Sequence, residues 1–284
     1  MKTIIAGLIL LTCSSSIAQD NDSKARTALA GESGDPWGSG SSRRQASFTY
    51  QVKGNAAETW LVIDNLSSDL KIEGTSGSDI KIESRNYRGL PDKAKGLKPL
   101  SATGPENTGI GLSMKQEGNT ISLSGAHREA DNADYILYLP KNLKLKINYN
   151  SWQAGDVLIK GMTGEVEAKS QVGDLEFIDV SGPIVAHTLS SDLEVTFTTL
   201  SATSPSSLSS TSGDIDVTLP ESTKGTFKMA TVSGGVYTAF DFEFGEDAKM
   251  SRVGGQNATG KLNGGGVEIS LKTVSGDIYV RKAE

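Results

Sequence analysis

Five aspartates recur in the second half of the 284-residue chain, each directly before a segment in which apolar and other residues alternate: Asp156, Asp174, Asp192, Asp214 and Asp277. Regularly spaced carboxylates could bind calcium, because calcium-binding β-rolls collect several oxygen ligands for each ion from successive turns. Those rolls need a Gly-Gly-x-Gly-x-Asp arrangement, whereas this chain has one turn residue and one acid in each unit. We therefore interpret the five aspartates as structural residues of a repeat, which accept hydrogen bonds from backbone N–H groups at tight corners, and we expect no metal site.

Residues suited to nucleophilic catalysis are scarce. The two histidines, His127 and His187, fall in a polar loop and on the outward side of a predicted strand. No G-x-S-x-G elbow and no H-E-x-x-H motif is present. The single cysteine, Cys13, lies so near the N-terminus that a processed chain would contain no thiol for catalysis, disulfides or zinc. We expect a protein that is not an enzyme and that uses no cofactor.

Outward acids leave one catalytic alternative open. Glycoside hydrolysis needs two carboxyl groups at a defined separation in a cleft. Two groups of acids could supply such a pair: Glu167, Glu176 and Glu194, or Asp241, Glu243, Glu246 and Asp247. Trp60 and Trp152 could stack on sugar rings, although Trp60 lies within a strand pattern that favours packing. Interleaved Lys160 and Lys169 favour a solvated outer face, so a carbohydrate-active β-helix is the alternative hypothesis.

The recurrent aspartates belong to a nine-residue repeat over residues 155–199. Two columns of apolar residues run through it: Val157, Val166, Leu175, Ile184 and Leu193, and then Ile159, Ala168, Phe177, Ala186 and Val195. A short fixed period with alternating apolar positions indicates stacked strands. We predict an all-β, single-chain β-solenoid with about 18 residues in each two-strand coil and roughly 4.8 Å between coils. No stretch sustains helical spacing.

The rest of the chain divides by composition. Residues 1–18 read as a signal peptide cleaved between Ala18 and Gln19, because a basic residue, a short apolar run and small residues follow in order. In a rival interpretation Cys13 carries a lipid that attaches the protein to a membrane. Residues 19–46 are polar and aperiodic, which predicts a disordered linker. The solenoid domain covers 47–284, with an irregular N-terminal β region and a regular array from about 134.

Two further segments are predicted from composition. Residues 85–108 are rich in Gly, Pro and Lys and read as a long surface loop, of the kind that is functional or mobile. The last strand ends in the charged residues Arg281, Lys282 and Glu284. We expect this charged strand at the end of the array, where it would discourage end-to-end pairing.

Charge limits the possible partners. The chain has 34 acidic and 28 basic residues, a net charge of −6, and its basic residues are scattered. Nucleic-acid binding is not expected, because neutralising phosphates needs clustered positive charge. No apolar run is long enough for a transmembrane span. We expect an exported protein in the periplasm, on the outer surface or outside the cell.

The repeat units also resemble those of a known family. The segment YILYLPKNLKLKI leads into the units QAGDVLI, QVGDLEF, LSSDLEV, TSGDIDV and VSGDIYV. This pattern resembles the bacterial adhesin domain family of exported β-solenoids, well over residues 134–280 and weakly from residue 47. It departs from the pattern at SATSPSSLSS and after Phe240. The resemblance implies cell-surface binding and transfers no catalytic residues.

Our leading hypothesis is an exported, non-enzymatic, adhesin-like β-solenoid that presents a rigid surface to a cell-surface or envelope protein or glycan. The alternative is the carbohydrate-active β-helix, which binds or cleaves polysaccharide through outward carboxylates. A third hypothesis is a structural envelope component with no ligand of its own.

Overall fold

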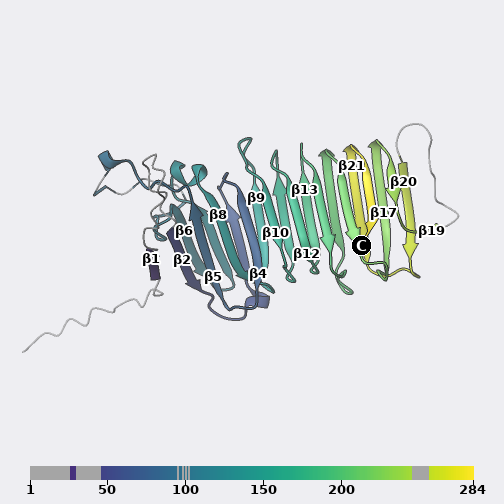
Figure 1. Cartoon of the computed structure of the whole chain (residues 1–284), viewed down its shortest axis with the longest axis horizontal. Coiled ribbons are helices and arrows are strands. Elements are labelled where there is room, and N and C mark those ends of the chain that lie inside the picture. Colours follow the sequence, from purple (N-terminus) through teal and green to yellow (C-terminus); the bar gives the residue numbers. More distant parts are fainter. Residues whose placement is uncertain are drawn as a thin grey trace, which may run out of the picture.

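A computed structural model describes residues 26–29, 46–94, 96, 97, 99, 101, 103–244 and 256–284. Within them the chain forms two long β-sheets of eleven strands each, and Figure 1 shows the strands side by side across a long, narrow molecule. The first sheet, sheet A, has the spatial order β1 (Arg26–Leu29), β2 (Ala46–Gln51), β5 (Asp79–Arg85), β8 (Asp134–Pro140), β4 (Leu70–Thr75), β10 (Val157–Lys160), β12 (Leu175–Val180), β14 (Leu193–Phe197), β16 (Ile215–Leu219), β22 (Ile278–Lys282) and β18 (Val236–Thr238).

The second sheet, sheet B, runs alongside it. Its order is β19 (Glu243–Phe244), β20 (Gln256–Leu262), β17 (Gly225–Ser233), β21 (Glu268–Ser275), β15 (Ser206–Ser212), β13 (Ile184–Thr188), β11 (Val166–Ser170), β9 (Lys144–Tyr149), β3 (Trp60–Asp64), β7 (Thr120–Gly125) and β6 (Leu112–Glu117). The helices of the described residues are three short 3-10 turns: η1 (Ala56–Glu58), η2 (Asp92–Ala94) and η3 (Arg128–Asn132). The prediction of an all-β solenoid is confirmed.

The regular coils alternate between the two sheets. From β9 to β16 each strand enters the sheet opposite to the one before it, so Val157 pairs in parallel with Leu175, and Leu175 with Leu193. The repeat between neighbouring coils is 18 residues here, as predicted, and widens to 22 where SATSPSSLSS is inserted. The first predicted apolar column therefore divides between two facing sheets, with Val157 in sheet A and Val166 in sheet B.

Inward side chains form one continuous core between the sheets. Val157, Leu175 and Leu193 of sheet A, like Val166 and Ile184 of sheet B, are almost completely buried. Each buried apolar side chain of this size contributes roughly 1.5–3 kcal/mol. A one-residue slip would bring Glu167, Glu176 and Glu194 into the core, so the buried side chains fix the register of these coils.

The coils at both ends of the array are out of sequence order. At the N-terminal end, β3 and β4 lie between β9–β10 and β7–β8. At the C-terminal end, β21 and β22 lie between β15–β16 and β17–β18. The prediction that the charged last strand closes the array is wrong, because β22 pairs with β16 on one side and β18 on the other. Phe227, Phe240 and Phe242 instead pack together near that end, with 5.2 Å between the rings of Phe227 and Phe242.

The segments before and between the coils are described only in part. Within the predicted linker, Arg26–Leu29 forms β1, which pairs antiparallel with β2 and which composition did not predict. Cys13, Ala18 and Gln19 lie outside the described residues. The 85–108 segment is tied to the N-terminal strands, since Thr103 Oγ1 donates to the carbonyl of Gly125 at 2.7 Å and Asn107 bonds both backbone groups of Met114.

Candidate functional site

The recurrent aspartates form a hydrogen-bonded ladder across sheet A, at the ends where its parallel strands begin. Four of these carboxylates accept the backbone N–H of the aspartate in the next coil, at distances of 3.0 Å from Asp174 to Asp156 and 3.3 Å from Asp192 to Asp174. The series continues through Asp214 and Asp277 at 2.8 and 2.7 Å. The bonds therefore join neighbouring coils, and do not close the turn in which each aspartate lies.

The ladder extends beyond the five predicted aspartates at both ends. Asp69 at the start of β4 accepts the N–H of Asp156 at 3.2 Å, and Asp277 accepts the N–H of Gly235 at 2.7 Å. Asp69 has the same Asp-apolar-x-apolar pattern as the later units, although it lies far from them in sequence. In the described part of the chain, no three or more His, Cys, Asp or Glu side chains are grouped so that they could hold a metal ion.

A second row of side chains faces outward from the strands beside the ladder. Strand register aligns Glu176, Glu194, Asp216, Tyr279 and Tyr237 on five adjacent strands. The rings of Tyr237 and Tyr279 stack at 5.3 Å, and the Arg281 guanidinium lies 5.1 Å from the centre of the Tyr279 ring. Arg281 Nε donates to both carboxylate oxygens of Asp216, at 2.9 and 2.8 Å. We call the five aligned residues, Glu176, Glu194, Asp216, Tyr279 and Tyr237, the outer row.

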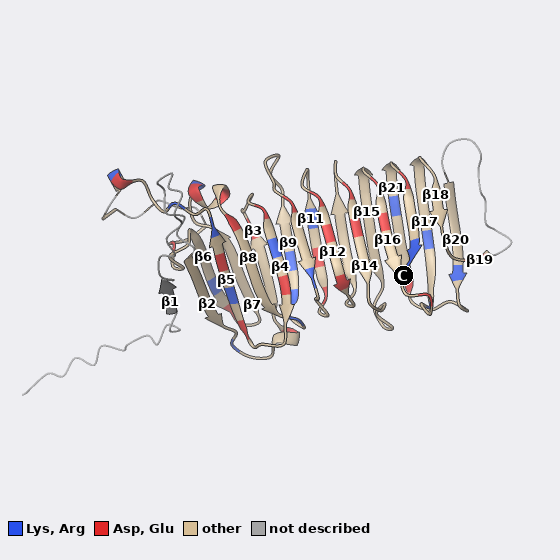
Figure 2. Cartoon of the chain, viewed as in Figure 1, with Lys and Arg blue, Asp and Glu red and all other residues tan. Residues whose placement is uncertain are grey.

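Carboxylates dominate this side of sheet A, where Figure 2 shows acidic residues on β12, β14 and β16. Burial raises the pKa of Glu194 above its usual range, and nearby Glu176 and Asp216 raise it further. Burial likewise raises the pKa of Asp174, with added repulsion from Asp156 and Asp192, although the N–H of Asp192 opposes this shift. Charge repulsion between these neighbouring carboxylates therefore lowers the stability of the folded chain.

We predict that these two acids make stability depend on pH. A raised pKa means that the folded chain binds protons more readily than the unfolded chain, so the free energy of unfolding falls as the pH rises above the ordinary values of 3.8 for Asp174 and 4.5 for Glu194. The variant Asp174→Asn/Glu194→Gln should therefore melt about 1–2 °C higher at pH 7 and lose part of this dependence. Asparagine keeps an oxygen for the N–H of Asp192.

The measurement is a series of thermal melts by circular dichroism between pH 4 and pH 7. The control is Glu268→Gln in sheet B, whose carboxylate pairs with Lys228 at 2.7 Å and should lose stability slightly or not at all. A double variant that melts below the parent protein at pH 7 would contradict the prediction.

The other predicted acids and histidines do not converge. Glu167 lies on β11 in sheet B and pairs with Lys146 at 2.6 Å, so the predicted strip with Glu176 and Glu194 is wrong: alternate nine-residue units enter opposite sheets. Asp241 and Glu243 are exposed, and Glu246 and Asp247 lie outside the described residues. His127 Nε2 lies 3.0 Å from the Tyr87 hydroxyl, while His187 Nδ1 lies 3.0 Å from Ser209 Oγ on sheet B.

The two tryptophans also lie apart. Trp60 is half-buried on β3, with the Lys144 ammonium 5.3 Å from its ring centre. Trp152 is 76% exposed in the loop before β10. Trp60 therefore packs beneath a lysine, and the two rings do not form one stacking surface.

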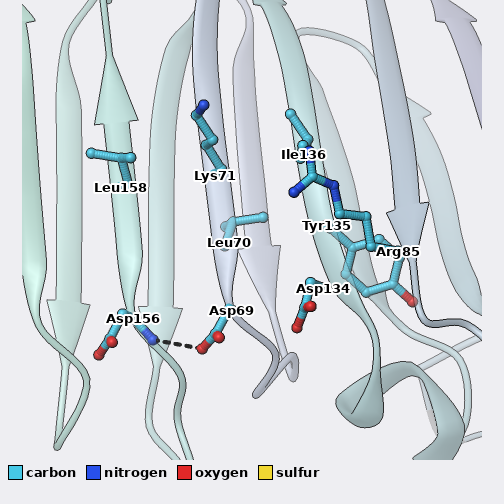
Figure 3. Close-up of a pocket in the computed structure, with 9 residues that line it drawn as sticks. All are labelled: Asp69, Leu70, Lys71, Arg85, Asp134, Tyr135, Ile136, Asp156 and Leu158. Carbon is cyan, nitrogen blue, oxygen red and sulfur yellow. Dashed lines mark hydrogen bonds between the residues drawn. The ribbon is translucent and has the colours of Figure 1, made fainter.

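A shallow cavity of about 280 Å³ opens on sheet A where β5, β8, β4 and β10 meet. Strands β8, β4 and β10 are parallel and start at this edge, whereas β5 is antiparallel and ends here, which brings Arg85 beside Asp134. Figure 3 shows Asp134, Asp69 and Asp156 in a row at the strand starts. The charged ends of the Arg85 and Lys71 side chains lie away from this row, farther along the strands. We call this cavity the junction pocket; its floor contains Ile136 and Leu158.

Sequence reasoning missed the junction pocket. Asp134 was recognised only as the start of a strand, and Arg85 as the first residue of a predicted loop. Only the Asp-apolar-x-apolar pattern of Asp69 connects one of these residues to the repeat. In the part of the chain that the structure describes, no helix is both long and apolar enough to cross a bilayer.

Part of the chain resembles a known family. Residues 153–281 match the model of the Toastrack DUF4097 family. The coils are Toastrack-like. The match starts just before β10 and ends in β22, within the region of the sequence resemblance to adhesin domains. It agrees with the two-sheet β-solenoid. No curated protein matches the chain.

Several solved structures are similar to this chain at low identity. A candidate cell adhesion protein from Clostridium sporogenes is 14% identical, with a TM-score of 0.44 over 84% of this chain and 100% of the other. A candidate adhesin from Bacteroides fragilis is 15% identical, with a TM-score of 0.32 over 84% and 97%. A candidate lipid-binding protein from Parabacteroides distasonis is 10% identical, with a TM-score of 0.26 over 84% and 97%.

Proposed function

We propose that this protein is an exported, non-enzymatic, adhesin-like binding protein whose outer strand faces contact a cell-surface or envelope partner. The observation that carries the proposal is the outer row on sheet A. Its side chains are held in register by five adjacent strands that pair along their length. A surface held this way loses little conformational entropy on binding, which suits many weak contacts to one extended partner.

The charge of this face indicates the chemistry of the partner. Among the described residues neither Glu176 nor Glu194 forms an ion pair, since the nearby Arg281 pairs with Asp216, and the Asp ladder lies next to them. The face would therefore attract a positively charged stretch of a surface protein or an amino-bearing glycan. Electrostatic attraction of this kind weakens as salt is added.

We predict that the mature protein, immobilised from residue 19, retains a partner from envelope extracts or a glycan panel. Retention should fall several-fold between low and physiological salt. Glu176→Gln/Glu194→Gln should lower retention several-fold because it removes two adjacent charges of the outer row. The matched control, Glu167→Gln/Glu268→Gln, removes two charges from sheet B and should bind like the parent. Absence of any retained partner at low salt, or equal losses for both variants, would refute the proposal.

A second candidate is a polysaccharide-binding or polysaccharide-cleaving solenoid. The stacked pair Tyr237 and Tyr279 favours it, because exposed aromatic rings can stack on sugars and Tyr237 is 54% exposed beside the acids of the outer row. Tyr237→Ala would then abolish binding to the retained glycan, and release of reducing ends from that glycan would mark cleavage. Undiminished glycan binding in Tyr237→Ala, with no product released, would exclude both cleavage and the Tyr237–Tyr279 pair as the sugar site, and no glycan binding by the parent protein would exclude the second candidate.

A further inference from the structure

The junction pocket combines unmatched charges of both signs with an apolar floor. The side chain of Arg85 forms no hydrogen bond or ion pair in the described part of the chain, although Asp134 lies directly opposite Arg85 in the β5–β8 register. Asp134 itself accepts a hydrogen bond from Asn86 Nδ2 at 2.9 Å. The other cation of the pocket, Lys71, is occupied by Glu73 at 2.7 Å. Arg85 is therefore the cation left free to bind an anionic group.

The carboxylates at the opposite side have free acceptor capacity. Asp69 and Asp156 each use one oxygen, Oδ1, to accept a backbone N–H of the next coil. Neither carboxylate forms an ion pair with a lysine or arginine among the residues that the structure describes. Their second oxygens can accept hydrogen bonds from an ammonium group, which supplies three donors.

Two apolar side chains face outward between these charges. Strand register places Ile136, Lys71, Leu158 and Glu176 at the same outward position on four adjacent strands. Ile136 points outward yet is only 5% exposed, and it lines the cavity together with Leu158. An apolar floor with a few polar groups at its rim is the usual composition of a small-molecule site.

We propose that the junction pocket binds a small zwitterion, with a carboxylate on Arg85, an ammonium group on Asp69 and Asp156, and an apolar side chain on Ile136 and Leu158. The volume of about 280 Å³ lies at the lower end of ligand pockets, which fits a short peptide with free ends. Guanidinium groups bind carboxylates through two parallel hydrogen bonds, so the two ends of the peptide are distinguished. This inference does not depend on the outer row or on the proposed adhesin function.

The test is isothermal titration of the mature protein with the dipeptide alanyl-leucine and two analogues. N-acetylation removes the ammonium group and C-terminal amidation removes the carboxylate, and each change should weaken binding about tenfold or more. Arg85→Gln should weaken binding of the free dipeptide to the level of the amide and abolish the preference between them. Asp69→Asn/Asp156→Asn should weaken binding of the free dipeptide to the level of the N-acetyl form and abolish the preference between these two. The asparagine oxygens still accept the hydrogen bonds of the ladder.

Two matched controls separate binding from folding. Arg88→Gln changes an exposed arginine outside the pocket, and Asp192→Asn changes a ladder aspartate outside it, so both should bind like the parent protein. The melting temperature of every variant is measured in parallel, because a pocket variant that unfolds cannot report on binding and is replaced by Arg85→Lys. Equal affinity for all three peptides, or no saturable binding up to about 10 mM, would overturn the inference.

Discussion

Gly173→Ala is expected to lower the free energy of unfolding by about 3 kcal/mol, the upper end of the usual cost of overpacking. Gly173 lies at the corner between β11 and β12, next to Gly155 at the corresponding corner of the preceding coil. A Cβ atom there would lie 2.0 Å from the carbonyl oxygen of Gly155 and 2.7 Å from its carbonyl carbon. Both are backbone atoms, so no side-chain rotation can relieve the clash. The two coils would have to separate, which would strain the Asp156–Asp174 hydrogen bond beside them.

The matched control is Gly77→Ala in the turn between β4 and β5. A Cβ atom at Gly77 meets only Thr75 Oγ1, at 3.5 Å, which is an ordinary contact. This substitution should change stability by less than about 0.5 kcal/mol. Urea unfolding followed by circular dichroism measures both variants. Equal midpoints for Gly173→Ala and Gly77→Ala would show that the corners do not require glycine.

The sequence predicts the regular coils well because their pattern is local. Apolar residues at the first and third positions of each strand, such as Leu175 and Phe177 in β12, specify the inward face, and the turn residue marks each corner. The hairpin of β6 and β7 around Gly118 is likewise formed by residues that are close in sequence. Each of these features needs only neighbouring residues, so it can be recognised without knowing the rest of the fold.

The order of the coils could not be predicted in the same way. The N–H of Asp156 donates to Asp69 although the intervening chain forms β4 to β9, and the N–H of Asp277 donates to Asp214 although the intervening chain forms β16 to β21. Parallel pairing offers no local turn signal from which the partner strand could be identified. The nine-residue units also do not reveal that alternate strands enter different sheets, which is why Glu167 was grouped with Glu176.

The same distinction between local and long-range features applies to the candidate site. The ladder follows from a repeated motif, and only its inter-coil hydrogen bonding needed the structure. The junction pocket depends on an antiparallel strand meeting parallel ones, so that Arg85 and Asp134 adjoin although they begin and end different segments. No periodicity relates these residues, and an unpaired arginine cannot be recognised until its neighbours are known.

Phe177→Ala is expected to cost about 3–5 kcal/mol, the largest effect of any substitution considered. Phe177 is 1% exposed in β12, and its register neighbours are Ile159 on β10 and Val195 on β14. Both neighbouring strands are held by their own backbone pairing, so they cannot move inward to fill the space that the ring leaves. The cost is therefore the lost burial of the ring plus the cavity that remains.

The same change made at the surface provides the control. Phe244 in β19 is 45% exposed, and Phe244→Ala should cost less than about 1 kcal/mol. Each coil of a solenoid is stabilised chiefly by its neighbours, so a cavity at β12 should also uncouple the coils on its two sides. Hydrogen exchange should then show faster exchange of β10, β12 and β14 than of β21 and β22 in Phe177→Ala. Uniform acceleration across all coils would instead mean that the array unfolds as one cooperative unit and that coupling between coils does not depend on this ring.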